Sequence, residues 1–416
     1  MADDWQTMTV ADLGRVVTGK TPPTAKPQLY GSGYPFITPT DIGSYRYCET
    51  ARQVSEEGRE SQRNLLLPAK TVCVTCIASV GKMCMTDRPS FTNQQINSVI
   101  ADEMRHDPFF VYYLLQTRVE HLKAIAGGAA TPIINKTAFS EIEVSVPPLP
   151  VQRRIAGILS AYDELMENSQ RRIRLLEAMA RALYREWFVH FRFPGHEKHP
   201  RVASPLGDIP QGWEVKPLND VVDDIVDYRG KTPKKLNGDW SDEGILALSA
   251  LNVKGGRLVS LEKSRCVNED LYSRWMKNPL RRGDILMTSE APLGELYFLC
   301  KEERYCLSQR LFSLRANSSV IAPVILYLCM ESEQTQHELR SRASGATVSG
   351  IRQSELRKIP IVVPPGSIQE RAAPILQRLA EQKFTLDAKL QNLRRTRDLL
   401  LPRLLSGQVE LKTEGA

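Results

Sequence analysis

The sequence predicts an α+β fold in which two tandem mixed α/β domains are separated by two long antiparallel coiled-coil helices, with a pseudo-twofold internal repeat. Three observations predict it. Landmarks of the first half return in the same order in the second half. Short alternating apolar segments, punctuated by Gly and Pro, fill the first part of each copy. A long stretch with apolar residues at heptad spacing closes each copy.

The internal repeat is the most informative feature. The tetrapeptide GKTP begins at Gly19 and again at Gly230, which is 211 residues later. Near the end of each copy, Gln152 in VPPLPVQRRIA is matched by Gln369 in VPPGSIQERAA, 217 residues later. The offset grows slowly along the chain, as expected for a duplication with small loop insertions in the second copy.

The repeat divides the chain into successive segments. The globular segments are expected to be rich in β structure, with one amphipathic helix at 107–125 in the first and one at 322–343 in the second. We expect globular domains at 1–151 and 213–367, long helices at 152–190 and 368–406, a linker at 191–212 and a tail at 407–416.

Two heptad seams predict that the long helices pack on each other. The 4-3-4-3 spacing persists too far for packing against one globular domain, which favours an antiparallel helix pair. In the second helix Lys383 and Arg397 interrupt the apolar positions. The seam residues are Ile155, Leu159, Tyr162, Met166, Ile173, Leu176, Leu183 and Trp187 in the first helix, and Leu376, Leu379, Leu386, Leu390, Leu393, Leu400 and Leu404 in the second.

Composition narrows the class of protein. No apolar run approaches the roughly 18 residues of a membrane span, and the start lacks the apolar core of a signal peptide, so a cytoplasmic protein is expected. The net charge of +7 permits a nucleic-acid partner. Cys73 and Cys76 have zinc-ligand spacing and Cys84 follows, but no second C-x-x-C appears. We expect no metal site there, but free thiols packed in a sheet.

The segment Gly14–Thr21, GRVVTGKT, matches the phosphate-binding pattern G-x-x-x-x-G-K-T. A phosphate loop needs a helix directly after the Thr, whereas Pro22 and Pro23 follow here. In the second copy Ile225 aligns with Gly14, so the duplication kept only GKTP. The sequence therefore argues against an ATPase.

Other enzyme signatures are absent from the sequence. N-P-P-Y, H-E-x-x-H and G-x-S-x-G do not occur, and no glycine-rich turn suggests a nucleotide or S-adenosylmethionine site. Lone carboxylates such as Glu290 and Glu295 are expected to be loop or fold residues. The chain is expected to bind rather than to catalyse, with no catalytic residues of its own.

With these elements in place, the sequence resembles the specificity subunit of type I restriction-modification systems over nearly its whole length. The resemblance rests on GKTP in each half and on the V-P-P…Q entry to each long helix. It also rests on LYREWF at Leu183–Phe188, SPLGDIPQGW at Ser204–Trp213 and LLLPRLLSGQVEL at Leu399–Leu411.

The resemblance implies a non-catalytic DNA-binding subunit. Each domain would be a target recognition domain that reads one half of a bipartite DNA target, and the helices would set the gap between the halves. The implied partners are double-stranded DNA, two methyltransferase (modification) subunits and restriction (translocase/endonuclease) subunits, with no membrane. S-adenosylmethionine, ATP and Mg would be bound by those partner subunits and no cofactor by this chain. Because the segments between landmarks differ, the half-sites are expected to differ.

Candidate DNA contacts are loop residues whose donors suit phosphates or base edges. Among them Gln95 and Asn252 are the strongest candidates for base readout. The alternative function that remains open is a coiled-coil protein–protein scaffold with two globular partner-binding ends. The candidates are Lys20, Thr21, Lys26, Thr38, Thr40, Ser79, Lys82, Gln94 and Gln95 in the first domain, and Lys231, Thr232, Lys234, Lys235, Ser249, Asn252, Lys254, Ser289 and Arg310 in the second.

Overall fold

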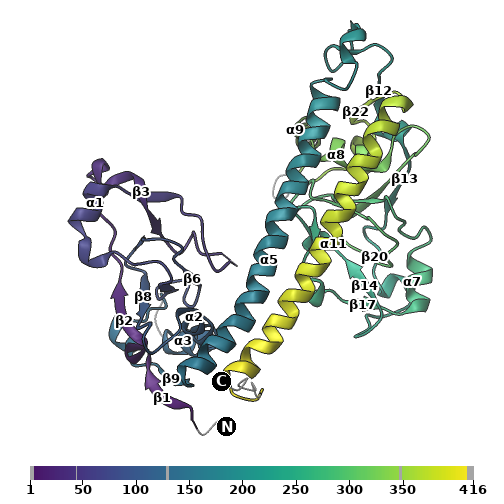
Figure 1. Ribbon diagram of the computed structural model, residues 1–416. Coiled ribbons are helices and arrows are strands. Elements are labelled where there is room, and N and C mark those ends of the chain that lie inside the picture. Colours follow the sequence, from purple (N-terminus) through teal and green to yellow (C-terminus); the bar gives the residue numbers. More distant parts are fainter. Residues whose placement is uncertain (1–3, 44, 128–130, 346–348, 410–416) are drawn as a thin grey trace. The chain divides into compact units, whose positions relative to one another are not determined.

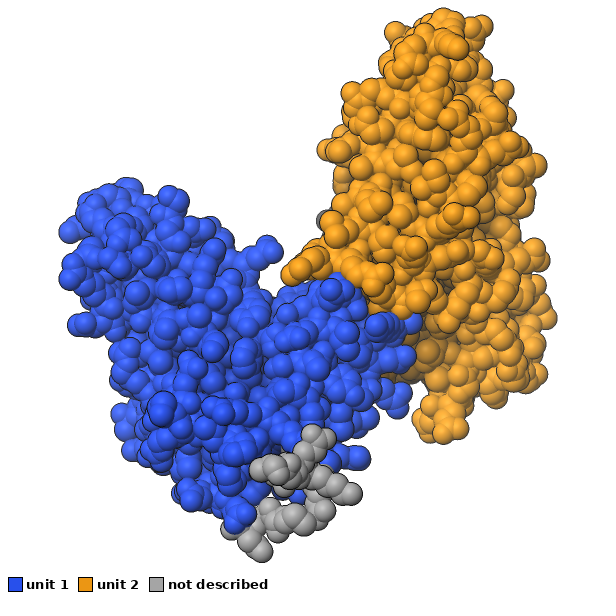
Figure 2. Space-filling model, in the orientation of Figure 1, with its two compact units in different colours: residues 1–170, 388–416 blue, residues 171–387 orange. Residues whose placement is uncertain are grey.

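The computed structural model describes residues 4–43, 45–127, 131–345 and 349–409 of the chain. The chain forms two compact units, one of residues 1–170 with 388–416 and the other of residues 171–387 (Figure 2). Each unit therefore contains one globular domain together with part of each long helix (Figure 1).

Three sheets form the framework of unit 1. The largest is antiparallel, with the order β2-β8-β5-β6. A second has the order β4-β3-β7, in which β3 pairs antiparallel with β4 and parallel with β7, and a third pairs β1 with β9. The bounds are β1 Gln6–Thr9, β2 Gly14–Thr18, β3 Tyr30–Ile37, β4 Arg52–Val54, β5 Val72–Thr75, β6 Met83–Met85, β7 Phe91–Thr92, β8 Ile96–Ala101 and β9 Glu143–Val146.

Short helices complete unit 1. Helix α2 begins after Asp107, whose carboxylate accepts hydrogen bonds from the N–H groups of Phe109 and Phe110, both at 3.0 Å. The apolar face of α2 and the large sheet form the main core, which includes Val99 and Tyr113. The bounds are α1 Glu56–Ser61, α2 Pro108–Gln116, α3 Val119–Ile125 and α4 Lys136–Ser140.

Unit 2 repeats the same three sheets. Its largest sheet has the order β13-β21-β18-β19, its second the order β17-β14-β20 with a parallel β14–β20 pair, and its third pairs β12 with β22. The shared topology confirms the internal repeat. The bounds are β12 Glu214–Pro217, β13 Val222–Asp227, β14 Ile245–Leu248, β17 Cys266–Val267, β18 Ile285–Thr288, β19 Leu296–Phe298, β20 Cys306–Leu307, β21 Leu311–Ala316 and β22 Pro360–Val363.

Unit 2 adds short helices and two small hairpins to this framework. Its main core joins Phe312 and Leu314 of β21 to Ile325 and Met330 of α8. The bounds are α6 Leu218–Val221, α7 Glu269–Trp275, α8 Pro323–Glu331, α9 Glu333–Ser341 and α10 Gln353–Leu356, with the two-residue strands β10 Arg201–Val202, β11 Ile209–Pro210, β15 Val253–Lys254 and β16 Arg257–Leu258.

The long helices are α5, Leu149–Tyr184, and α11, Gly366–Leu405 (Figure 1). In unit 1 Leu159, near the start of α5, shares a core with Leu404, near the end of α11. In unit 2 Tyr184, at the end of α5, shares a core with Leu376, near the start of α11. The helices thus pair antiparallel in each unit, as predicted. Every seam residue named from the sequence is buried or half-buried.

Two predicted single helices are each divided into two. The segment 107–125 forms α2 and α3, and the segment 322–343 forms α8 and α9. In the second case the hydroxyl of Ser332 accepts from the N–H of Thr335 at 3.4 Å and starts a new helix. The apolar spacing continues across both breaks, so the pattern by itself did not reveal them.

The strand pairing corrects one detail of the repeat alignment. Val16 lies opposite Val99 in β2–β8, and Ile225 lies opposite Leu314 in β13–β21. Ile225 therefore takes the place of Val16 rather than that of Gly14, because the second copy has extra residues before its GKTP. A glycine is needed at position 14, since a Cβ there would lie 2.1 Å from a carbonyl oxygen of β8.

The segment expected to be a linker is packed into unit 2. Phe193 is fully buried, and its ring stacks on Trp213 with the centroids 5.6 Å apart. Phe188 also lies against Trp213, at 5.9 Å. The Pro- and Gly-rich composition of 191–212 predicted the turns correctly but gave no signal for this aromatic cluster.

Candidate nucleic-acid interface

The GKTP loop of unit 1 follows β2 and is fixed against the loop 93–95. Lys20 N donates to the carbonyl of Thr92 at 2.9 Å. A Cβ on Gly19 would lie 2.2 Å from that same oxygen, so only glycine permits this close approach. Thr21 Oγ1 donates to Gln94 Oε1 at 2.6 Å. The loop thus holds candidate residues from two segments together, with the Lys20 side chain exposed.

The same geometry excludes a phosphate-binding loop. Residues Gly14–Thr18 form strand β2, and the helical turn nearest after Thr21 is a single 3₁₀ turn at Pro27–Leu29. A nucleotide phosphate would need the N-terminus of an α-helix directly after Thr21. The match to the motif is therefore a strand followed by a shaped turn.

A side-chain-capped turn is repeated in both units. In unit 1 the Asp41 carboxylate accepts from Thr38 N at 2.8 Å and from Thr38 Oγ1 at 2.7 Å. In unit 2 the Asn252 amide oxygen accepts from Ser249 N at 2.9 Å. Asp41 and Asn252 therefore accept the equivalent hydrogen bond and stabilise the same turn in the two copies.

This turn corrects the expectation that Asn252 reads a base. Its side chain is only 4% exposed. Its amide nitrogen donates to Val259 O at 3.1 Å and to Ser264 Oγ at 2.9 Å, and its oxygen is taken by Ser249. No hydrogen-bonding capacity of Asn252 is left facing solvent, so it shapes the loop and does not face a base.

A second loop adjoins this turn in each unit. In unit 2 Ala250 N donates to Gln309 O at 3.2 Å, and Ser289 N donates to Arg310 O at 2.9 Å. The Arg310 guanidinium is half exposed and lies 3.0 Å from the carboxylate of Glu290. Ser289 is buried, so its hydroxyl is another candidate that the fold withdraws from solvent.

The GKTP loop of unit 2 uses its lysines differently. Lys231 Nζ donates to Trp275 O at 3.0 Å and lies 4.2 Å from the ring centroid of Tyr228. Lys235 Nζ donates to Gly230 O at 2.8 Å. Lys231 is thereby engaged in holding the loop, whereas Lys234 beside it is exposed.

Exposure sorts the remaining candidates. Those on the surface are Lys20, Lys26, Thr40, Lys82, Gln94, Lys234, Lys235, Lys254 and Arg310, and those half-buried are Thr21, Thr38, Ser79, Gln95, Lys231, Thr232 and Ser249. The amide oxygen of Gln95 accepts from Asn93 Nδ2 at 3.0 Å, so part of its hydrogen-bonding capacity is already used.

Two surface features of unit 2 were missed by the sequence reasoning. Leu251 is 80% exposed at the tip of the capped turn. Strands β15 and β16 form a hairpin whose turn residues, Gly255 and Gly256, have φ of +56° and +70°. Two positive φ angles define the turn that suits a two-residue hairpin. The tetrapeptide KGGR, Lys254–Arg257, is the sequence feature that indicates this hairpin.

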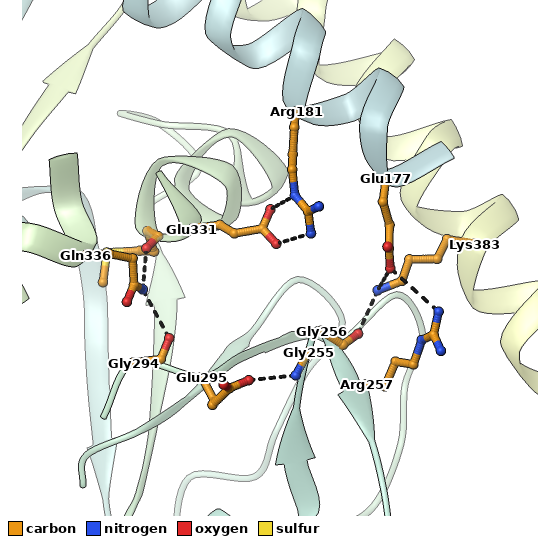
Figure 3. Close-up of polar contacts among 11 residues, drawn as sticks. Glu177, Arg181, Gly255, Gly256, Arg257, Gly294, Glu295, Glu331, Gln336 and Lys383 are labelled. Carbon is orange, nitrogen blue, oxygen red and sulfur yellow. Dashed lines mark hydrogen bonds and ion pairs between the residues drawn. The ribbon is translucent and has the colours of Figure 1, made fainter. Parts of the chain in front are cut away.

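Polar contacts hold this hairpin from two sides (Figure 3). Gly255 N donates to Glu295 Oε2 at 2.6 Å, which joins it to the turn before β19. Lys383 Nζ donates to Gly256 O at 2.7 Å, which joins it to α11. The hairpin that carries the exposed Lys254 is therefore held in place by contacts on two sides.

The cysteines behave as structural thiols. Cys73 and Cys84 lie opposite each other in β5–β6, and both are buried. Burial raises the pKa of the Cys76 thiol to about 11. A thiol of such pKa stays protonated near pH 7 in this buried environment. Within the described ranges, no three His, Cys, Asp or Glu side chains are grouped as a metal site.

Comparisons with known proteins identify the family. The model of the type I restriction modification DNA specificity domain matches residues 2–178 and again 210–393. The MjaIX specificity subunit of Methanocaldococcus jannaschii, a type I restriction enzyme subunit, is 26% identical over 98% of this chain and 94% of its own length. The HindI specificity subunit of Haemophilus influenzae is 36% identical over 42% of this chain and 39% of its own length.

The fold agrees with these matches. A crystal structure of the S subunit of a type I restriction-modification system from M. genitalium superposes with a TM-score of 0.66 at 18% identity, covering 96% of each chain. Among the described residues, no helix is both long and apolar enough to cross a membrane. With one family domain in each half, this chain belongs to the DNA specificity subunits of type I restriction-modification systems.

Proposed function

We propose that this chain reads an asymmetric bipartite DNA target, one half with each globular domain, and directs methyltransferase and restriction subunits to it. The proposal goes beyond family membership in assigning the two half-sites to the two units. It also assigns no catalytic step to this chain.

One observation carries the asymmetry. The two units share their sheets, the capped turn and the adjoining loop, yet matched positions on that frame carry different chemistry. Base readout depends on side chains that reach the groove edges from such loops. A common frame with different side chains is what two different half-sites require. The differing pairs are Thr40 and Leu251, Lys82 and Glu295, and Gln95 and Arg310.

The partners follow from the same assignment. A chain that only reads DNA needs methyltransferase subunits that bind S-adenosylmethionine, and restriction subunits that use ATP and Mg, to modify or cleave the target. Such a complex acts on the cell's own and incoming DNA, so we place it in the cytoplasm. The related proteins are specificity subunits of type I restriction enzymes, which supports partners of this kind.

The test is methylation mapping followed by binding. The complex of this chain with its methyltransferase subunits is used to methylate random DNA, and the modified adenines are sequenced to define the target. Binding to that duplex is then compared with duplexes in which either half is scrambled. Each scrambled half is expected to lower affinity at least tenfold at moderate salt. Equal affinity for the target and for random DNA refutes the proposal.

A further inference from the structure

Two cations interrupt the apolar seam of α11, and each meets a carboxylate of α5. In unit 2 Lys383 Nζ lies 3.2 Å from Glu177 Oε1 (Figure 3), and in unit 1 Arg397 Nη1 lies 3.0 Å from Asp163 Oδ1. The four side chains are between 6% and 19% exposed. These are ion pairs in a largely buried seam, where an unmatched charge is unfavourable.

The spacing of the two pairs is the same on both helices. Asp163 and Glu177 are 14 residues apart on α5, and Lys383 and Arg397 are 14 residues apart on α11. Fourteen residues are two heptads, so the pairs occupy equivalent seam positions. Each pair, observed within its own unit, therefore implies the same antiparallel register of the two helices.

An apolar seam alone selects a register only weakly. Sliding one helix by one heptad, about 10 Å, brings apolar residues opposite apolar residues again. The ion pairs between the helices do not survive such a slide. Arg397 and Lys383 would then face neutral residues such as Gln170, and all four charges would lose their partners on the facing helix in one step, while Arg397 would keep only its contact with Asp398 of its own helix. Single polar positions in coiled coils fix register in this way.

Each pair also contacts a globular domain. Tyr113 OH, on α2, donates to Asp163 Oδ2 at 2.6 Å in unit 1. In unit 2 Lys383 Nζ donates to Gly256 O of the β15–β16 hairpin. Gly256 has a φ of +70°, which favours glycine, and a Cβ there would lie 2.9 Å from the end of the flexible Lys383 side chain.

The hairpin has a second link to α11 beside the first. Arg257 Nε lies 3.2 Å from Asp387 Oδ1, an ion pair without the alignment of a hydrogen bond. Arg46 in unit 1 occupies the matching place, 211 residues earlier, and lies 3.5 Å from Glu167 of α5. In each unit an arginine that follows the capped turn thus reaches the long helix that follows its own domain.

We propose that Asp163–Arg397 and Glu177–Lys383 are register keys, positioning residues that hold α5 and α11 in one antiparallel register and tie that register to the two DNA-reading domains. The first part concerns the protein alone. The second part rests on the proposed function, because it predicts how well the chain discriminates between targets of different gap length.

Cross-linking tests the register directly. In a background with Cys48→Ser and Cys266→Ser, the pair Ala180→Cys with Ala380→Cys reports the observed register. The pair Ala180→Cys with Ala373→Cys reports a slide of one heptad. All three alanines are half-buried against the core of unit 2. A short thiol–thiol cross-linker and mass spectrometry give the yields.

The key-bearing chain is expected to cross-link through the first pair only. A charge-free chain, with Asp163→Asn, Glu177→Gln, Lys383→Met and Arg397→Met, should cross-link through the second pair at least tenfold more than the key-bearing chain does. Identical patterns in the two chains overturn the proposal. Far-UV circular dichroism and cooperative thermal unfolding establish that each variant is folded.

If the charge-free chain does not fold, a smaller change decides. Glu177→Gln with Lys383→Met removes one key and keeps the other, while Lys383→Arg keeps both charges and serves as the matched control. The one-key chain must give more of the slid cross-link than the control. Equal yields overturn the proposal.

The DNA arm is separate from the register arm. With methyltransferase subunits bound, the folded charge-free chain should methylate targets whose gap is lengthened or shortened at least tenfold better, relative to the true target, than the key-bearing chain does. If cross-linking shows the slide but discrimination between gap lengths is unchanged, the second part of the proposal, on DNA, is overturned. The first part, that the two ion pairs set the helix register, is then still supported. Because cross-linking uses no DNA, its failure does not bear on the proposed function.

Discussion

The two glycines of the repeated GKTP element are needed for different physical reasons. Gly19 has no room for a Cβ, because the Thr92 carbonyl oxygen would lie 2.2 Å away. Gly230 has nothing within 4 Å of a Cβ, but its φ is +82°. Glycine at this position of the repeat is thus required by a steric limit in unit 1 and by a positive φ in unit 2.

Substitution separates these two reasons. Gly19→Ala is expected to lower the free energy of unfolding by about 1–3 kcal/mol, because the GKTP loop must move away from β7. Gly230→Asn is expected to lower the free energy of unfolding by much less than Gly19→Ala does, since Asn tolerates positive φ. Urea unfolding of both variants measures the difference. Equal losses would show that the close contact at Gly19 is relaxed in solution.

Neighbouring residues of the capped turn should separate stability from DNA binding. Asn252→Ala is expected to lower the free energy of unfolding by about 1–3 kcal/mol, because its buried partners lose their hydrogen bonds. Lys254→Ala should leave stability unchanged and reduce the slope of log affinity against log salt by about 0.9, as for one lost phosphate contact. Denaturation and binding titrations at several salt concentrations measure both effects. If Asn252→Ala left the free energy of unfolding unchanged, Asn252 would again be a candidate for base readout.

At the scale of the element, the segment 191–212 shows how composition can mislead. Its Pro, Gly and charged residues are typical of a linker, and they do form turns and the small β10–β11 hairpin. Phe193 nevertheless inserts into an aromatic cluster with Trp213. Phe193 and Ile209, both buried in the core of unit 2, with Phe191 packed on Trp213, fix a segment whose remaining residues are largely exposed.

Truncating that aromatic residue tests its role. Phe193→Ala is expected to lower the free energy of unfolding of unit 2 by about 3–5 kcal/mol, because it leaves a cavity against Trp213. Val202→Ala, in the same segment but 40% exposed, should change it by no more than about 0.5 kcal/mol. Thermal unfolding followed by tryptophan fluorescence compares the two. Equal effects would mean that the segment is a linker in solution.

At the scale of the whole molecule, the two copies of the repeat share their sheets but carry different side chains at matched loop positions. Lys82 of unit 1 reaches the Pro39 carbonyl at 3.3 Å and is exposed, whereas Glu295, in the matching place of unit 2, binds the hairpin backbone. The cation that unit 2 presents nearby is Lys254, on a hairpin that has no counterpart strand pair among the described residues of unit 1. The units thus place positive charge by different means.

This difference predicts additive effects of changes in the two units. Lys82→Ala and Lys254→Ala are each expected to reduce the salt slope by about 0.9, and the double variant by about 1.8. Independent contributions follow if each lysine meets a different part of the DNA. Fluorescence anisotropy with the mapped target, over a range of salt, measures the slopes. A double variant no weaker than either single variant would contradict separate contacts.

The repeat, the β-rich character of each globular segment and the helix pair were all predictable from sequence, since they depend on periodicity and order. Every seam residue named from the heptad spacing is buried or half-buried, and two interruptions of that spacing, Lys383 and Arg397, marked sites whose partners Asp163 and Glu177 it did not name. Helix breaks after Gln116 and Glu331 were missed because apolar spacing continues across them. Roles of single polar residues were the least predictable, as Asn252 shows.

What the sequence determined by itself is therefore the architecture: a duplicated domain and helix, without an enzyme signature, in the order of the specificity family. Only the tertiary structure decided which polar side chains are used internally and which face solvent. That depends on contacts between segments far apart in the chain, such as Lys231 with Trp275, or Lys383 with Gly256. A hydrogen-bond donor looks the same in a sequence whether it meets DNA or a carbonyl of its own chain, because only the fold determines how close that carbonyl lies.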